Sequence, residues 1–129
     1  MFFIADTHSF LWYLSEDPRI GKKAKSKFEL AEKGDATIGV PTIVLAESLH
    51  ILEKKKYILK FKDIVSRLEI GWNFIPVPLD LNIIKKIEAL KKLDDLHDRI
   101  IVASAILMGA ELISKDENIK KSRYVKVVW

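Results

Sequence analysis

The 129-residue sequence contains no cysteine and no glutamine. Without cysteine the chain has neither disulfide bonds nor thiolate metal ligands. The longest apolar run, residues 100–110, is too short to span a bilayer, so we expect no membrane segment. No basic region precedes Phe2 and Phe3, so we expect no secretory signal and, by default, a cytoplasmic protein. Repeats, low-complexity tracts and Gly/Ser linkers are also missing, so we expect a single domain spanning residues 1–129.

The charge of the chain is modestly positive. Apolar residues make up 49% and charged residues 31%, which is typical of a folded globular protein. The net charge of +4 comes mostly from lysine, with 18 Lys against 4 Arg. Such a balance permits nucleic-acid binding but does not establish it. The lack of glutamine, together with abundant Lys and Glu, is also typical of heat-adapted proteins.

Short apolar runs alternate with segments of helical periodicity, a pattern that predicts an α/β fold with a mostly parallel sheet of about five strands. One helix is expected after Pro18 and stops at Gly34. Asp80 is expected to cap a second helix that extends to Leu90. The most apolar helix starts near Leu96 and must be buried against the sheet. We expect strands at about residues 2–5, 36–40, 74–75, 111–114 and 125–128, the third lying between Trp72 and Pro76. The other helices are expected at about residues 7–14, 42–55 and 61–70.

Four acidic residues stand where a solvated surface charge would not be expected. Asp6 directly follows the apolar residues 2–5, and Glu47 interrupts the mostly apolar residues 43–49. Asp98, followed by Arg99, precedes the apolar residues 100–103, and Asp116 comes shortly after Leu112 and Ile113. Carboxylates in core-forming sequence are unfavourable unless they are paired or bound to a cation. A single metal site that gathers all four would explain every one of them.

The expected fold brings the four acids together. Asp6 and Asp116 follow the first and fourth strands, at the sheet edge where open α/β sheets bind ligands. Asp98 falls in the first turn of its helix and Glu47 in the second turn of its own, and both helices begin at that edge. The helix dipole favours an ionised Asp98, whereas four clustered carboxylates without metal would resist full ionisation. Oxygen donors without cysteine or histidine indicate Mg²⁺ or Mn²⁺.

Each acid also has an ordinary structural explanation. Asp6 is well placed to cap the helix that follows it. A small change of helical register would expose Glu47 to solvent. Asp94, Asp95 and Asp98 are compatible with an acidic capping cluster, and Asp116 with a solvated turn. The metal site therefore rests on the coincidence of all four, since no single acid establishes it.

Five segments together resemble the PIN-domain ribonucleases, and among them the VapC toxins of type II toxin–antitoxin pairs. In order along the chain, they are residues 4–12 (IADTHSFLW), 17–20 (DPRI), 46–47 (AE), 97–105 (HDRIIVASA) and 112–117 (LISKDE). The order and spacing of these short motifs are more specific than any one of them. The resemblance extends from the first strand to Trp129.

The resemblance implies a three-layer α/β/α PIN-like fold and a Mg²⁺- or Mn²⁺-dependent endoribonuclease. It places metal ligands at Asp6, Asp98 and Asp116, with Glu47 as a direct or water-mediated ligand. Ser114 matches a hydroxyl position that orients the acids, and Asp95 falls near a position that is often acidic, for which Asp94 competes. It also implies an RNA substrate, a VapB-like antitoxin that binds the active-site groove, and a homodimer. The number of metal ions and the RNA target stay open.

Basic residues and histidines carry weaker signals. We predict RNA contacts from Lys115, beside Asp116, and from Arg99. The cluster Lys22, Lys23, Lys25 and Lys27 does not by itself establish phosphate binding. We expect His8 to be an ordinary exposed or packed histidine and His97 to face solvent in the loop before its helix.

Two further hypotheses follow from the sequence. The helices over residues 42–55 and 60–68 carry a nearly continuous apolar series that favours either a helical hairpin core or a groove for an antitoxin segment. The main alternative to a nuclease is a catalytically silent PIN-like module that binds RNA or protein.

Overall fold

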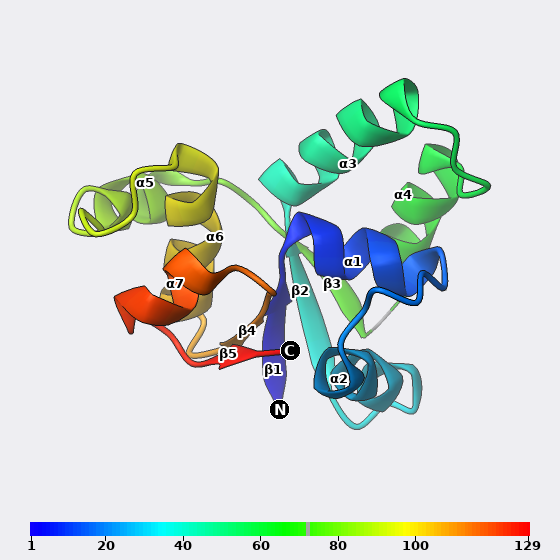
Figure 1. Ribbon diagram of the computed structural model, residues 1–129, viewed down its shortest axis with the longest axis horizontal. Coiled ribbons are helices and arrows are strands. Elements are labelled where there is room, and N and C mark those ends of the chain that lie inside the picture. Colours follow the sequence, from blue (N-terminus) through cyan, green and yellow to red (C-terminus); the bar gives the residue numbers. More distant parts are fainter. Residues whose placement is uncertain (72) are drawn as a thin grey trace.

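Five parallel strands form the central sheet, in the order β3-β2-β1-β4-β5 (Figure 1). The computed structural model describes residues 1–71 and 73–129 of the chain. Every neighbouring pair of strands is parallel. The strands are β1 (Phe2–Ala5), β2 (Thr37–Pro41), β3 (Phe74–Val77), β4 (Glu111–Ile113) and β5 (Val127–Val128).

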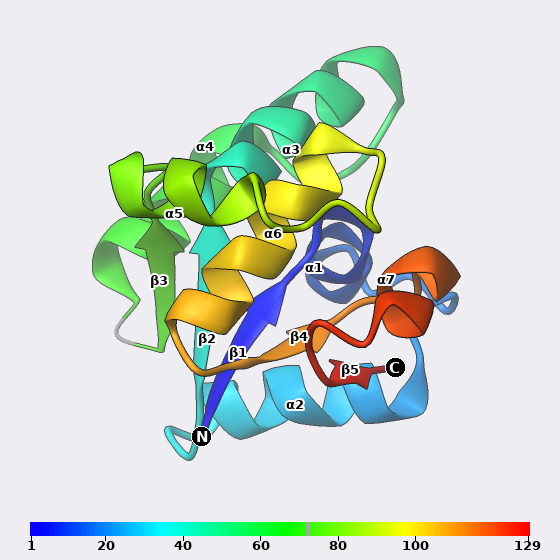
Figure 2. The ribbon, with the colours of Figure 1, turned by 90° about the vertical axis from the view of Figure 1, so that its left-hand side faces the viewer.

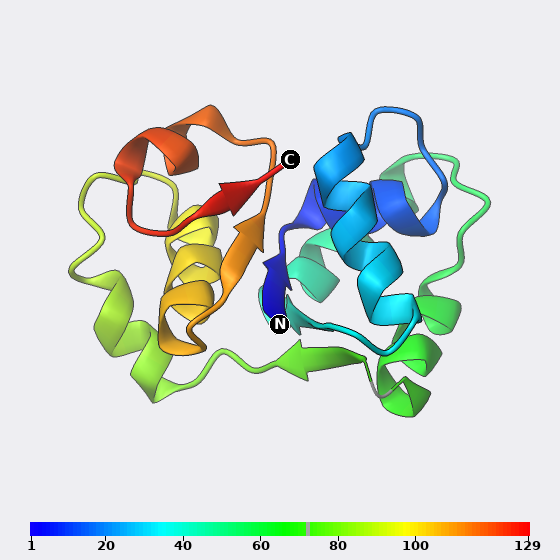
Figure 3. The same cartoon turned by 90° about the horizontal axis from the view of Figure 1, so that it is seen from below.

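The helices lie in two groups on opposite sides of the sheet (Figures 1 and 3). The helices of the first group connect β1 to β2 and β2 to β3, and those of the second connect β3 to β4 and β4 to β5. The three-layer α/β/α arrangement predicted from the sequence is confirmed. The first group is α1 (Thr7–Leu14), α2 (Lys22–Glu32), α3 (Thr42–Lys54) and α4 (Phe61–Ile70); the second is α5 (Leu81–Ile87), α6 (Leu96–Leu107) and α7 (Glu117–Ser122).

The strand order reverses between β1 and β4. From β1 the chain adds β2 and then β3 on one side, and later adds β4 and β5 on the other. The two sets of connections leave the sheet on opposite faces, so a crevice opens at the carboxyl ends of β1 and β4. In open α/β sheets this reversal point is where ligands bind. It is also where Asp6 and Asp116 are located.

Helix α6 is the centre of the core on its side of the sheet, where it crosses β1 in Figure 2. Residues 100–105 of this helix are all buried, as its all-round apolar sequence predicts. Opposite, Phe28 of α2 is fully buried and stacks on Tyr13 at 4.4 Å between ring centroids. Each large apolar side chain buried in this way contributes about 1.5–3 kcal/mol relative to exposure.

Two predictions about helix ends are confirmed. The carboxylate of Asp80 accepts a hydrogen bond from the amide of Ile83 and caps α5. Gly34 follows α2 with φ of 86°, a left-handed conformation that glycine adopts readily. None of the helices in the described part of the chain has the length and apolar character needed to cross a membrane.

Two local predictions need correction. Pro76 lies inside β3, opposite Val40, rather than ending that strand. An edge strand such as β3 tolerates proline, because its missing N–H can face away from the sheet. Helix α5 ends at Ile87, and Leu90 follows in a turn, although it is still buried. Helix α7 was not predicted. Trp72, which served as a boundary of the third strand, lies outside the described residues.

Candidate functional site

Three acidic residues at the carboxyl edge of the sheet are helix N-caps. Asp6 accepts a hydrogen bond from the amide of Ser9 (2.9 Å), Asp95 from that of Asp98 (3.0 Å) and Asp116 from that of Ile119 (3.0 Å). The capping explanation considered for Asp6 is therefore correct. It does not exclude a ligand role, because a carboxylate offers about four acceptor sites and the cap uses one. Capping also fixes the orientation of each carboxylate.

The four acids singled out in the sequence line one cavity of about 520 Å³. Asp6 follows β1, Asp116 follows β4, Asp98 lies in the first turn of α6, and Glu47 lies in the second turn of α3. Asp95 lines the same cavity, which we call the acidic pocket. Their convergence follows from the sheet topology, as the position of each acid at a strand or helix end predicted.

Glu47 is held by two residues that sequence reasoning did not place in the site. The hydroxyl of Thr7 donates a 2.8 Å hydrogen bond to Oε1 of Glu47. Nδ1 of His97 lies 3.1 Å from Oε2. The His97 side chain is about half exposed, as expected, but it lies in the first turn of α6 rather than in the loop before that helix. Its contact with Glu47 was not predicted. Thr7 is 40 residues from Glu47 in sequence, and no local pattern signals a contact of this kind.

Burial and the neighbouring carboxylates of the acidic pocket raise the pKa of Asp98 to about 6. Burial is the largest cause, followed by repulsion from Asp116, Asp95, Asp6 and Glu47. The helix dipole was expected to favour an ionised Asp98, but burial and repulsion outweigh it. The expectation that the clustered acids resist full ionisation is thus confirmed for this residue. Burial also raises the pKa of Asp6, against hydrogen bonds from Ser114 and Ser9 that lower it.

Ser114 connects two of the acids. It is buried at the end of β4, where its hydroxyl accepts a 3.0 Å hydrogen bond from the amide of Asp116. Its side chain also helps to lower the pKa of Asp6, so Ser114 acts on both acids. This geometry agrees with the orienting role implied by the resemblance, although the role itself stays a prediction.

The residues of the acidic pocket fit a hard divalent cation. Their donors are carboxylate oxygens, the ligands that Mg²⁺ and Mn²⁺ prefer. Repulsion from four neighbouring carboxylates contributes to the raised pKa of Asp98, and a cation would relieve that repulsion. In residues 1–71 and 73–129, however, no three His, Asp or Glu side chains are arranged closely enough to hold a metal ion as they stand. Binding therefore requires side-chain movement.

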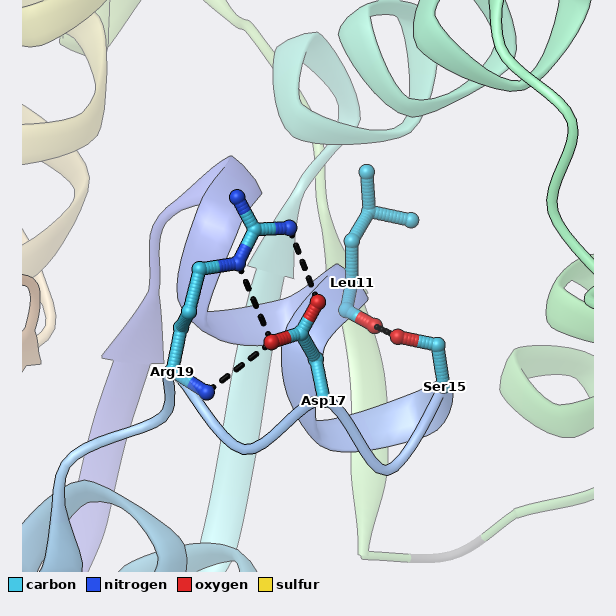
Figure 4. A network of polar contacts seen from close by, with 4 residues as sticks. All are labelled: Leu11, Ser15, Asp17 and Arg19. Carbon is cyan, nitrogen blue, oxygen red and sulfur yellow. Dashed lines mark hydrogen bonds and ion pairs between the residues drawn. The ribbon is translucent and has the colours of Figure 1, made fainter.

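Trp12 forms an aromatic wall of the acidic pocket. Its ring is buried, and Cζ of Arg19 lies 4.5 Å from the ring centroid. Both oxygens of Asp17 accept hydrogen bonds from the Arg19 guanidinium, at 3.0 and 2.8 Å (Figure 4), and these bonds lower the pKa of Asp17. The segment Asp17–Ile20, part of the family resemblance, therefore acts on the pocket by supporting Trp12.

The two predicted RNA contacts lie in different places. Nζ of Lys115 is 5.7 Å from the centroid of the Trp12 ring, and Lys115 lines the acidic pocket. The guanidinium of Arg99 instead donates to the carbonyl of Leu93 (2.6 Å) and to that of Ile87 (3.5 Å). Arg99 thus fixes the connection between α5 and α6. The structure brings Lys115 to the pocket and engages Arg99 elsewhere.

Known proteins resemble this chain in family and fold. The family profile described as "PIN domain" matches residues 3–123. VapBC2 from Rickettsia felis, solved bound to a DNA fragment from its promoter, has a similar fold, with a TM-score of 0.71 and 20% identity over 98% of this chain and 97% of that one. FitAcB from Neisseria gonorrhoeae gives a TM-score of 0.68 and 16% identity over 97% and 95% of the two chains.

A third similar structure is a toxin–antitoxin complex from Klebsiella pneumoniae, with a TM-score of 0.65 and 21% identity over 95% of this chain and 93% of that one. No curated protein matches the chain significantly. At these identities the solved structures establish the fold.

Proposed function

The chain belongs to the PIN domain family, and from this we propose that it is a metal-dependent endoribonuclease, the toxin of a VapBC-type pair. The observation that carries the proposal is the convergence of Asp6, Glu47, Asp98 and Asp116 on one pocket at the reversal point of the sheet. The similar folds of VapBC2 and of the Klebsiella toxin–antitoxin complex support the toxin assignment.

Asp6, Asp98 and Asp116 would hold Mg²⁺ or Mn²⁺, with Glu47 as a direct or water-mediated ligand. When bound, the cation lowers the pKa of a water and offsets negative charge on the phosphoryl oxygens. Thr7 and His97 hold the two oxygens of Glu47, so this carboxylate is oriented to accept a proton from a water at the pocket. Lys115, at the rim, places a positive charge where a phosphate would enter.

The structure offers apolar surface to an antitoxin segment on α3 and beyond it. Ile58, between α3 and α4, is fully exposed, and Leu49 of α3 is exposed as well. Ile51, one turn after Glu47, lines the acidic pocket. A segment that packs along α3 would therefore extend to the acids, where a basic side chain would compete with the metal and block RNA. We include this partner in the proposal, and a cytoplasmic location with it.

A homodimer through the other helices is also part of the proposal. Leu81 and Ile84 of α5 and Leu107 of α6 are exposed large apolar side chains. They are on the side of the sheet opposite α3, so a dimer there would leave the antitoxin surface accessible (Figure 1).

Expression alone and with an antitoxin tests the function. The purified chain should cleave RNA in Mg²⁺. We expect a neighbouring reading frame that encodes a small DNA-binding protein with a flexible tail, and co-expression with that protein should give a stable complex with strongly suppressed cleavage. The alternative, a catalytically silent binding module, predicts no cleavage in either sample. If the two proteins purify separately and cleavage is unchanged, the toxin assignment is wrong although the nuclease assignment survives.

A further inference from the structure

A second cavity, of about 710 Å³, adjoins the acidic pocket. Lys115 and Asp116 line both cavities, so the two are immediate neighbours. The second cavity follows the edge of the sheet from Glu111, at the start of β4, to Trp129, beyond β5. Figure 3 shows the end of the chain, after β5, between α2 and α7. We call this cavity the lysine groove.

Positive charge predominates in the lysine groove. Lys23 and Lys27 come from α2, Lys120 from α7, and Lys115 and Lys126 from loops. Lys126 is paired with Glu111 at 3.5 Å. The other four make no salt bridge with any carboxylate in residues 1–71 and 73–129. Glu111, Asp116 and Glu117 also line the groove, so five lysines stand against three carboxylates. The remaining positive charge forms a surface suited to a polyanion.

A further cavity next to the acidic pocket has the opposite character. This cavity, of about 680 Å³, shares Trp12 with the acidic pocket and is lined by Glu16, Asp17, Glu29 and Glu32. Only Lys25 and Arg67 offset these acids, and Arg67 is paired with Glu32. A phosphate chain leaving the acidic pocket on this side would meet net negative charge. The two exits are therefore electrostatically distinct.

We propose that the RNA strand leaves the acidic pocket through the lysine groove, with its phosphates on Lys23, Lys27 and Lys120. The proposal rests on the proposed nuclease function and adds the direction in which the substrate runs. RNA fits this groove better than an acidic peptide does, because the groove borders the pocket where a phosphodiester would be cleaved. Contacts of this kind are independent of base sequence and depend on salt.

The test compares two triple variants of equal charge. Lys23→Gln, Lys27→Gln and Lys120→Gln alter the groove. Lys85→Gln, Lys86→Gln and Lys91→Gln remove the same charge on and after α5, and both sets contain one half-buried and two exposed lysines. Gln keeps the helix propensity of Lys. Both sets are made in the full chain with Asp98→Asn, which is expected to suppress cleavage. Binding of a single-stranded RNA oligonucleotide is then measured at several salt concentrations.

The groove variant should bind RNA at least tenfold more weakly at 0.1 M salt. The slope of the logarithm of the association constant against the logarithm of salt concentration should fall by about 2, because each single-strand phosphate contact contributes about 0.7. The control variant should bind within about twofold of its parent. Nζ of Lys27 lies 5.5 Å from the Phe3 ring, so its loss would affect folding. If the triple variant has a lowered melting temperature, the double variant Lys23→Gln, Lys120→Gln gives the same test, with a change of about 1.4 in the slope of the salt dependence.

Three outcomes would overturn the proposal. Equal loss of affinity in the groove and control variants would show a general charge effect. If the groove variant binds RNA as tightly as its parent while the wild-type chain cleaves RNA, the groove is not the RNA path, and the nuclease assignment survives. If that variant also no longer binds the antitoxin, the groove is a protein-binding surface. Failure of the wild-type chain to bind or cleave RNA would refute the nuclease and the groove together.

Discussion

Changing Asp98 to Asn is expected to lower Mg²⁺-dependent RNA cleavage by about 100-fold or more, since even residues that only support a metal ligand contribute 10–100-fold. The same change should raise the melting temperature of the metal-free protein at pH 7. Asn keeps the shape of the side chain but removes a charge that burial and four neighbouring acids disfavour. Activity and stability therefore move in opposite directions.

Asp94→Asn is the matched control for this variant. Asp94 is exposed, lies before α6 and is not among the residues that line the acidic pocket. It should cleave RNA at the wild-type rate with an unchanged melting temperature. An Asp98→Asn protein as active as the wild type would refute the site assignment. A lower melting temperature in that variant would show that the helix dipole outweighs burial and repulsion.

A divalent cation should stabilise the protein strongly, and more so at pH 7 than at pH 5. A ligand that binds only the folded state at 100 times its Kd adds about 2.7 kcal/mol, which corresponds to roughly 10 °C in a domain of this size. Thermal melts with and without millimolar Mn²⁺ measure the shift. Absence of a shift at every Mn²⁺ concentration would contradict a metal site.

The pH dependence follows from the raised pKa of Asp98. An unfolded aspartate has a pKa near 3.8, against about 6 in the fold. The folded state therefore binds a proton more tightly, and this group contributes stability that is present below about pH 4 and is lost as pH rises through 6. In the metal-free protein this contribution is smaller at pH 7 than at pH 5. Protons compete with Mn²⁺ for the same carboxylates, so the metal-induced shift should shrink at pH 5, and in Asp98→Asn both pH effects should be weaker.

The convergence of the acids could be predicted from the sequence because each one marks the end of a secondary-structure element. Asp6 and Asp116 end strand patterns, and Asp98 opens a helix pattern. In a parallel sheet these ends meet at one edge whatever the details of packing. Glu47 joins them because helix α3 also begins at that edge. Topology alone therefore positions the candidate site.

Contacts between distant side chains could not be predicted in this way. The bond from Thr7 to Glu47 and the bonds from Arg99 to the carbonyls of Leu93 and Ile87 depend on tertiary packing. Helix α7 was missed because it has only six residues, of which only Ile119 and Ser122 are buried. Its N-cap is Asp116, a residue that the sequence analysis had treated as a metal ligand or as a solvated turn.

The most direct test of the central claim is RNA cleavage by the purified wild-type chain in EDTA, followed by addition of Mg²⁺ or Mn²⁺. If the acidic pocket is a metal site at which RNA is cut, EDTA should stop cleavage completely and either cation should restore it, in wild type and in Asp94→Asn but not in Asp98→Asn. Cleavage that continues at the same rate in excess EDTA would contradict the account.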